Sequence, residues 1–370
     1  MPLQSALDLL FAFREFKKQL YYLKLKIFSN KNFQLFLFLY IYITKNFNSH
    51  STLKLLFTII IPVYNRPIEM GELLESLVNQ DFSNDFEVLI IEDGSTNKSD
   101  KVIGKYKEQL NLKYFYKENS GAGASRNFGM QKALGNYFII LDSDVLLPKQ
   151  YLSEVKNALE NKFTAAFGGP DAAHTSFTPL QKAINYSMTA VLTTGGIRGK
   201  KQAVGKFQPR SFNLGLSKIA FEKTQGFSEM KNGEDIDLTF RLWKNGFETQ
   251  LIEKAFVYHK RRSSIQQFFK QTFGFGTARP LLNKKYPETA KITYWFPSVF
   301  IIGIDISIIL AIFGYHQLLY FYGFYFLLIF LDSFFQNKNI YVAFLSIFTS
   351  LTQFLGYGLG FLESQFFNKK

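Results

Sequence analysis

Two carboxylates separated by a single residue, Asp142 and Asp144, follow directly after the apolar run at residues 137–141. Such a pair at the end of a buried strand would repel unless a positive group lies between or beside its members. A hard divalent cation, Mg²⁺ or Mn²⁺, meets this need because it takes carboxylate oxygens and keeps coordination positions for substrate phosphates. The alternative is a pair of turn or capping residues before the helix expected at Pro148. We expect a divalent metal site here.

A second acidic cluster, Glu234, Asp235 and Asp237, opens a helix that should end near residues 245–246. Acids are favoured in a first helical turn by the helix dipole, and we assign that electrostatic role to Asp237. Asp235 would suit a general base if it faces the substrate. His259 ends a strand, and although a lone histidine is more often structural, one beside a carboxylate site is a candidate metal ligand.

Two turns after apolar strands carry side chains that could contact a nucleotide. The first presents Tyr64 and Asn65, and the second presents Asp93 ahead of Gly94. An acid just past a strand end can accept a hydrogen bond from a ribose hydroxyl or a base N–H. The same Asp-Gly-Ser sequence is also common turn chemistry, so this motif alone leaves both interpretations open.

A glycine-rich segment at residues 119–127 opens a further helix and includes Arg126. Free backbone N–H groups and a guanidinium there could bind an anion such as a diphosphate. The glycine spacing is not that of the dinucleotide-binding fingerprint, and the segment follows the third strand rather than the first.

The elements that must position these residues alternate between strand and helix from residue 57 to about residue 257. Apolar runs predict strands at 57–64, 87–91, 113–116 and 137–141, and apolar spacing predicts helices at 68–80, 100–110 and 124–134. Continuous apolar strands between helices indicate a mostly parallel sheet covered on both faces. Ligands of such sheets bind beyond the carboxyl ends of the strands, where the residues above are expected.

Five segments in this order resemble the family 2 glycosyltransferases of GT-A fold: IIPVYNRP, VLIIEDGST, NSGAGASRNFG, YFIILDSDVLLP and NGEDIDLTFRLWKNGF. The resemblance covers residues 57–259 and implies an α/β fold of Rossmann-like type. It also implies an inverting transfer of one sugar from a nucleotide-diphosphate sugar to an acceptor hydroxyl, assisted by Mg²⁺ or Mn²⁺. Glu92 stands where the family usually has the first of two aspartates.

The resemblance implies a role for each residue that matches a family motif. The nucleotide-sugar-binding residues would be Pro62, Tyr64, Asn65, Glu92, Asp93, Arg126 and Asp142. The metal ligands would be Asp144, Asp142 and His259, and the catalytic acidic pair would be Glu234 and Asp235, with Asp235 as the base. The Gln-x-x-Arg-Trp motif of processive synthases is missing from the sequence, which favours addition of a single sugar.

The C-terminal region, residues 293–370, is nearly uncharged and contains apolar segments at 294–313, 318–335 and 340–362. Each is long enough to cross a hydrocarbon core of roughly 30 Å, so we expect two or three transmembrane helices. Asp305 in the first segment and the short connection at 314–317 argue against the simplest three-span arrangement. Lys284 and Lys285 precede these segments and place the preceding domain in the cytoplasm by the positive-inside tendency.

We therefore expect a GT-A glycosyltransferase domain at residues 57–292, between a C-terminal membrane region and an N-terminal segment at residues 1–56. That N-terminal segment resembles a basic amphipathic helix on a membrane surface, or alternatively a helix packed on the catalytic domain. The absence of cysteine excludes thiol nucleophiles and cysteine-ligated metals.

The expected enzyme lies at the cytoplasmic membrane and acts on a lipid-linked or cell-surface glycan precursor. Alternatives are a transferase charging polyisoprenyl phosphate, whose anionic acceptor needs no base, and an inactive membrane scaffold that keeps the fold. Nucleic acid is not an expected partner despite the net charge of +14, because the basic residues are dispersed.

Overall fold

The computed structural model describes residues 55–195 and 206–367, which belong to one compact unit. The N-terminal segment expected to lie on a membrane surface falls almost wholly outside the described residues.

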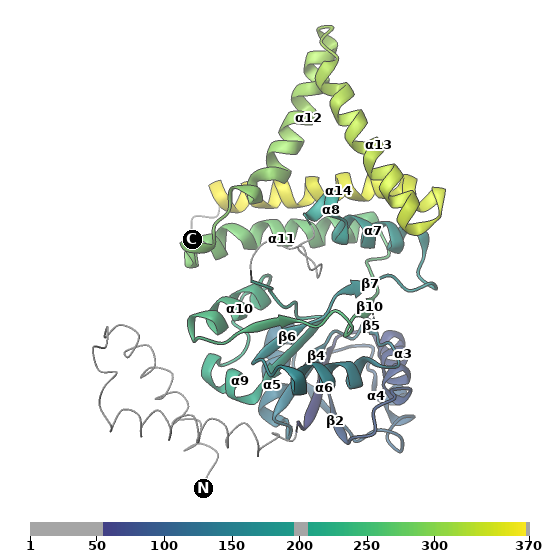
Figure 1. Cartoon of the computed structure of the whole chain (residues 1–370), viewed down its shortest axis with the longest axis vertical. Coiled ribbons are helices and arrows are strands. Elements are labelled where there is room, and N and C mark those ends of the chain that lie inside the picture. The colour runs from purple at the N-terminus through teal and green to yellow at the C-terminus, as the bar shows by residue number, and fades with distance from the viewer. Residues whose placement is uncertain (1–54, 196–205, 368–370) are drawn as a thin grey trace, which may run out of the picture. The chain divides into compact units, whose positions relative to one another are not determined.

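The centre of this unit is a seven-stranded sheet with the order β3-β2-β1-β4-β8-β6-β9 (Figure 1). Its strands are β1 Phe57–Val63, β2 Phe86–Asp93, β3 Leu112–Lys117, β4 Tyr137–Leu141, β6 Ala166–Gly168, β8 Asn213–Ser217 and β9 Thr249–Leu251. β1 pairs in parallel with β2 and β4, β2 with β3, and β6 with β9, whereas β8 runs antiparallel to β4 and β6. A smaller sheet combines β5 Val145–Leu146, β10 Val257–His259 and β7 Asp171–Ala172.

Helices cover both faces of the large sheet because its central strands are apolar on both sides. Odd-numbered β1 residues such as Ile59 and Ile61 pack with α3 Pro67–Val78, α4 Asp100–Gly104 and α6 Tyr151–Asn161. Ile60 faces the other way, toward α5 Ala122–Lys132, α9 Lys218–Thr224 and α10 Glu234–Lys244. The predicted α/β class and mostly parallel sheet are confirmed.

The strand at β8 and the antiparallel pairing around it were not predicted. Its sequence is NLGLS, with Gly215 at the centre, and glycine weakens a strand signal. The glycine is required by packing, because a Cβ at Gly215 would lie 1.9 Å from the ring of Phe167. The predicted helix at 100–110 is also shorter than expected, since α4 ends at Gly104 and turns follow it.

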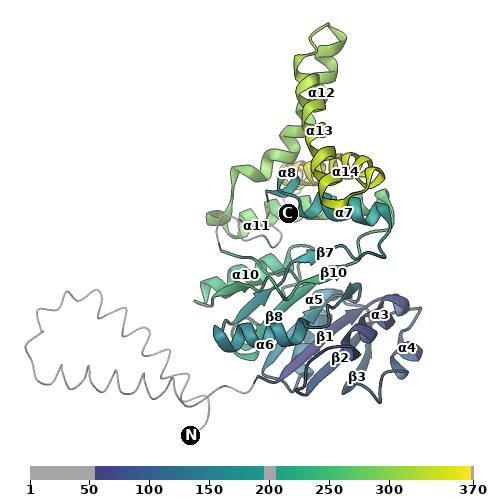
Figure 2. The same cartoon turned by 45° about the vertical axis from the view of Figure 1, so that its right-hand side comes forward.

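The remaining helices follow or interrupt the sheet region. They are α7 Pro179–Thr189, α8 Val191–Thr194, α11 Ile265–Lys285, the short η1 Pro287–Thr289 and η2 Ile292–Trp295, α12 Phe296–Ile312, α13 Gln317–Asn337 and α14 Ile340–Phe366. In Figures 1 and 2, α14 lies beside α7 and α11, whereas α12 and α13 lead away from that layer. Among the described residues, three helical segments are long and apolar enough to cross a membrane: Ile292–Ile312, α13 and α14.

Asp237 joins α10 to α11 through a buried cluster of hydrogen bonds and ion pairs. Its fully buried carboxylate accepts from Lys285 Nζ at 2.5 Å, Tyr286 Oη at 2.8 Å and Arg241 Nε at 2.9 Å. Although burial would raise the pKa of Asp237, the bonds from Lys285 and Tyr286 lower it. The residue therefore does more than complement the helix dipole.

We predict that Asp237→Asn destabilises the folded protein by about 2 kcal/mol, because the fully buried side chain loses its charge-assisted bonds to Lys285 and Arg241. The exposed Asp100→Asn, in the first turn of α4, should change stability by less than about 0.5 kcal/mol. Thermal unfolding of the purified full chain followed by tryptophan fluorescence would measure both. Equal unfolding temperatures for the two variants would contradict this role.

Candidate active site

Parallel strands bring three turns to one edge of the sheet. Tyr64 follows β1, Asp93 ends β2 and Asp142 follows β4. These turns border a cavity of about 170 Å³. Its lining includes six residues predicted from the sequence, Pro62, Tyr64, Asp93, Arg126, Asp142 and Asp144, together with Arg66 and Arg262. The chain therefore forms its cavity at the edge of the sheet where ligands of such folds bind.

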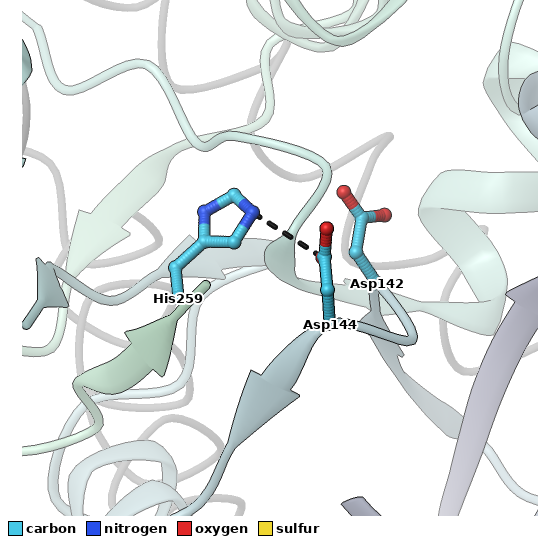
Figure 3. Close-up of side chains that lie close together, drawn as sticks. All are labelled: Asp142, Asp144 and His259. Carbon is cyan, nitrogen blue, oxygen red and sulfur yellow. Dashed lines mark ion pairs between the residues drawn. The ribbon is translucent and has the colours of Figure 1, made fainter. Parts of the chain in front are cut away.

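Asp142, Asp144 and His259 form a cluster at this cavity (Figure 3). One ligand atom from each residue lies within 4.8 Å of the others, and His259 Nε2 is 3.3 Å from Asp144 Oδ1. The short sheet brings His259 next to Asp144, because His259 on β10 pairs with Val145, the residue after Asp144. Asp142 and Asp144 line the cavity, and His259 lies next to Asp144 outside that lining. Two carboxylates and an imidazole form a donor set that fits Mn²⁺ or Mg²⁺.

Arg66 and His259 adjoin the buried carboxylate of Asp144. Burial alone would raise its pKa, but His259 and the ion pair with Arg66 hold that pKa well below the usual range. Asp144 is therefore ionised at neutral pH, as a metal ligand must be.

A second layer of polar residues orients His259. Its Nδ1 lies 4.0 Å from Asp171 Oδ2 and 3.4 Å from Arg261 Nη1, and its ring lies against Phe212 with centroids 4.7 Å apart. Arg261 forms an ion pair with Asp171 and donates to Asn185 Oδ1 at 2.9 Å. A histidine that ligates a metal through one ring nitrogen donates its other N–H to an acceptor, and Asp171 is the acceptor that faces Nδ1 here.

Arg126 connects the two acidic motifs of the site. From α5, its Nη2 donates to Asp142 Oδ1 at 2.7 Å and its Nη1 donates to Glu234 Oε1 at 2.9 Å. The side chain is 4% exposed, and the face of Phe227 lies 5.1 Å from the guanidinium carbon. The aspartates after β4 and the acids that open α10 are thereby brought into one site.

Glu234 and Asp235 occupy different environments within the acidic pair. Burial and the neighbouring charge of Asp235 raise the pKa of Glu234, while Arg126 opposes the rise. Asp235 Oδ2 accepts from the Ser211 backbone N–H at 3.4 Å and lies 3.8 Å from Arg210 Nη1. Glu234 is therefore tied to the Asp142 side of the site, whereas Asp235 is the less tightly held acid.

Three predicted nucleotide contacts have structural partners within the protein. Asp93 accepts backbone N–H groups from Ser120 at 3.0 Å and Gly121 at 2.9 Å, and so holds the glycine-rich segment while still reaching the cavity. Burial would raise the pKa of Asp93, but Lys117 and the Ser120 N–H lower it.

The other two side chains, Asn65 and Glu92, are not in the lining of this cavity. Asn65 Oδ1 accepts from Asn97 N at 2.8 Å, and Glu92, fully buried, accepts from Ser99 N at 2.9 Å. Both hold the loop that follows β2.

Arg66 and Arg262 are site residues that the sequence reasoning did not select. Arg66 belongs to the IIPVYNRP segment, and its place in that motif could have identified it as a site residue. Arg262 lies three residues after the end of β10, and the two- and three-residue strands of the short sheet that brings it to the cavity give no clear sequence signal.

The α/β fold, the acidic turn after β4 and the acidic helix start define a sugar-nucleotide transferase domain of GT-A type. Residues 58–223 match the sequence profile of Glycosyl transferase family 2, so the chain carries a family 2 glycosyltransferase domain. The family predicted from the five segments is confirmed.

Relatives support the same family. An uncharacterized glycosyltransferase of Rickettsia felis is 37% identical over 130 residues, which is 35% of this chain and 20% of that protein. Chondroitin synthase of Escherichia coli is 26% identical over 262 residues, covering 62% of this chain and 38% of the synthase. The chain thus spans about a fifth and two fifths of the lengths of these two relatives.

The solved structure of the mannosyltransferase PcManGT from Pyrobaculum calidifontis, in complex with GDP-Man and Mn²⁺, superposes with a TM-score of 0.59. The sequences are 14% identical, and the likeness covers 90% of this chain and 95% of that one. The likeness in fold therefore extends into the C-terminal helices.

We predict that Asp144→Asn weakens Mn²⁺ binding by more than about tenfold, because one ionised ligand is lost. Mn²⁺ titrations monitored by electron paramagnetic resonance measure this without any sugar or acceptor. Asp100→Asn removes a carboxylate that belongs neither to the cavity lining nor to the metal cluster, and it should leave the affinity unchanged. An unaltered affinity in Asp144→Asn would remove this residue from the metal site.

The raised pKa of Glu234 predicts a pH dependence. An acid whose pKa is higher in the folded state stabilises the fold at low pH, and that contribution disappears as the pH rises through the folded-state pKa. Wild type should therefore lose more stability than Glu234→Gln between about pH 5 and pH 8, measured by thermal unfolding in EDTA. The exposed Glu222→Gln should follow the wild type, and parallel curves for wild type and Glu234→Gln would refute the assignment.

Proposed function

We propose that this protein transfers a single sugar from a nucleotide-diphosphate sugar to an acceptor hydroxyl, with inversion at the anomeric carbon. The observation that carries the proposal is the bridge made by Arg126. It joins the Asp142 side of the metal cluster to Glu234, next to Asp235. One buried arginine therefore joins the candidate donor site to the acidic pair that contains the candidate base.

The donor would enter the cavity between the three strand-end turns. Tyr64 is about half exposed there and offers an aromatic face to the nucleotide base, next to Asp93. Arg66 and Arg262 line the same cavity and would contact the diphosphate, for which planar guanidinium groups are suited.

Asp142, Asp144 and His259 would hold the divalent cation, which neutralises charge on the diphosphate as it leaves. Arg66 now pairs with Asp144, so its guanidinium would turn toward the donor phosphates when the cation takes that carboxylate. Arg126 would keep Asp142 oriented throughout.

Asp235 would act as the general base. The acceptor oxygen attacks the anomeric carbon as the bond to the diphosphate oxygen breaks, and the acceptor proton passes to the Asp235 carboxylate. The Arg210 guanidinium lies 3.8 Å from this carboxylate. A carboxylate in this role is worth roughly 10² to 10⁴ in rate.

We further propose that the acceptor is lipid-linked and that the active site faces the cytoplasm. The start of α10, which carries both acids, packs against α11: a Cβ at Gly233 would lie 3.0 Å from Leu282. The acids therefore adjoin the layer of apolar helices, and Lys284 and Lys285 at the end of α11 fit the positive-inside tendency.

We predict that Asp235→Asn keeps donor binding and loses transfer by at least about 10²-fold. Donor binding is measured by calorimetry with UDP- and GDP-sugars in Mn²⁺. Transfer is measured as nucleoside diphosphate released when a lipid extract of bacterial membranes is added. Asp100→Asn serves as the variant that should retain both.

Two results would count against the base assignment. Equal loss of binding and transfer in Asp235→Asn would indicate a structural residue. Undiminished transfer would favour an anionic acceptor such as a polyisoprenyl phosphate, which needs no base.

A further inference from the structure

The three apolar helices that qualify as membrane spans differ in how much of their surface the protein itself covers. In the most apolar stretch of each segment, buried residues make up 17% for Ile292–Ile312, 11% for α13 and 44% for α14. Most residues of α12 and α13 are therefore partly or fully exposed, whereas nearly half of those in the apolar stretch of α14 are buried. Composition alone treats the three as equivalent, but their packing does not.

α14 lies along α11 with the two backbones in contact. A Cβ at Gly276 would meet the carbonyl oxygen of Tyr357 at 2.2 Å, and one at Gly360 would meet that of Phe273 at 2.2 Å. Figures 1 and 2 both show the two helices side by side. Because the two helices are in backbone contact along one another, α11 and α14 must have the same orientation relative to a bilayer.

α11 is fixed to the glycosyltransferase domain and carries cations along its length. Lys285 is bonded to Asp237 of α10 at 2.5 Å, and a Cβ at Gly274, in the middle of α11, would touch Asn232 at 3.0 Å. Lys270 and Arg279 occupy the first and second halves of the helix. A charged helix in contact with a polar domain does not cross hydrocarbon, because burying its cations there is costly.

The N-terminal half of α14 is attached to the same domain through α7. Ser187 Oγ of α7 is hydrogen-bonded to Thr349 Oγ1 at 2.6 Å and to Ser350 Oγ at 3.1 Å. Two residues before Ser187, Asn185 accepts a hydrogen bond from Arg261, beside the metal cluster. Both halves of α14 are thus tied to helices that belong to the catalytic side.

The free face of α14 is made of large apolar side chains. Most of its buried residues are small or polar, among them Ser346, Thr349, Gly356, Gly358, Gly360 and Ser364, although Val342, Phe354 and Phe361 are buried as well. Its exposed apolar residues include Phe344, Phe348, Leu359 and Phe366, each 42% to 54% exposed. This arrangement is the reverse of that of a helix on a water-soluble surface, and it suits contact with lipid.

α12 and α13 continue this apolar surface away from the layer. They are linked by residues 313–316 and packed together through Phe300, whose ring lies 5.0 Å from that of Tyr322. The 21 residues of Gln317–Asn337 give a helix about 31 Å long, enough to cross a hydrocarbon core of roughly 30 Å. The exposed apolar residues of α13 lie along its whole length and include Tyr320, Phe324, Leu328, Leu331 and Phe335.

We propose that α12 and α13 are the only two of these three helices that cross the membrane, and that α14 lies in the membrane plane. Its exposed face contacts the lipid headgroup and acyl boundary of the leaflet next to the catalytic domain. The occupant of that face is the bilayer, because the face is continuous with the apolar α12 and α13 hairpin. This topology does not depend on the proposed sugar transfer and can fail or hold independently of it.

The chain has no cysteine, so single cysteines can report on sidedness without background. Variants Tyr315→Cys, Gln365→Cys and Lys107→Cys, in the full chain in sealed membrane vesicles of known orientation, are labelled with a membrane-impermeant maleimide. Lys107 marks the catalytic domain. We expect Gln365→Cys to label with Lys107→Cys, and Tyr315→Cys only from the opposite side; labelling after detergent confirms that each cysteine is present and reactive.

Two labelling patterns would overturn the topology. Gln365→Cys labelled together with Tyr315→Cys would mean that α14 crosses as a third span. Tyr315→Cys labelled from the same side as Lys107→Cys would mean that the hairpin does not cross.

Depth measurements test the orientation of α14 directly. Spin labels at Phe348→Cys and Leu359→Cys stand eleven residues apart on its exposed face, and labels at Tyr320→Cys and Leu331→Cys have the same spacing on α13. Relaxation by oxygen and by a water-soluble nickel chelate should place the α14 pair at equal depth. The α13 pair should differ by up to about 16 Å.

Two depth results would refute the proposal. A difference between the α14 labels as large as that between the α13 labels would show a spanning helix. Exclusion of both relaxation agents from the α14 labels would show that a second copy of the chain, rather than lipid, covers this face.

Discussion

The site depends on balancing many carboxylates at one edge of a buried sheet. Asp142, Asp144, Glu234 and Asp235 come together there from two distant parts of the chain, and like charges at such distances disfavour one another's ionisation. Arginines from separate parts of the chain offset this repulsion. Arg66 pairs with Asp144, Arg126 pairs with both Asp142 and Glu234, and Arg210 lies near Asp235. A divalent cation and an anionic diphosphate can then enter a site whose local charges are already nearly paired.

The same balance connects the site to the apolar helices. Arg261, two residues after His259, is bonded to Asp171 within the small sheet and to Asn185 on α7. On the other side of the site, α10 is joined to α11 through Asp237. Both helices that support α14 are therefore attached to the residues around the chemistry. In the proposed topology, these attachments hold the catalytic edge at a fixed distance from the lipid surface.

Much of this arrangement could be predicted from sequence because the decisive residues follow strong apolar strands. The run before Asp142 and the alternation from residue 57 onward predicted the sheet, its carboxyl-end edge and the candidate metal ligands. Gly215 concealed the antiparallel strand β8, since a central glycine gives no strand signal, and the small sheet that delivers Arg262 rests on strands of two or three residues. The hydropathy of the sequence also predicted three apolar segments. Hydropathy depends on composition alone, so it cannot show which face of each helix is buried. The contact between Gly360 and α11 becomes visible only in three dimensions.

The central claim is a nucleotide-sugar site organised by a divalent cation at Asp142, Asp144 and His259. Calorimetric titration of the full-length wild-type protein with UDP- and GDP-sugars, in Mn²⁺ and again in EDTA, tests it most directly. The account predicts that one class of nucleotide sugar binds in Mn²⁺ and that this binding disappears in EDTA. Binding of equal strength in both solutions, or no binding of any nucleotide sugar, would contradict it.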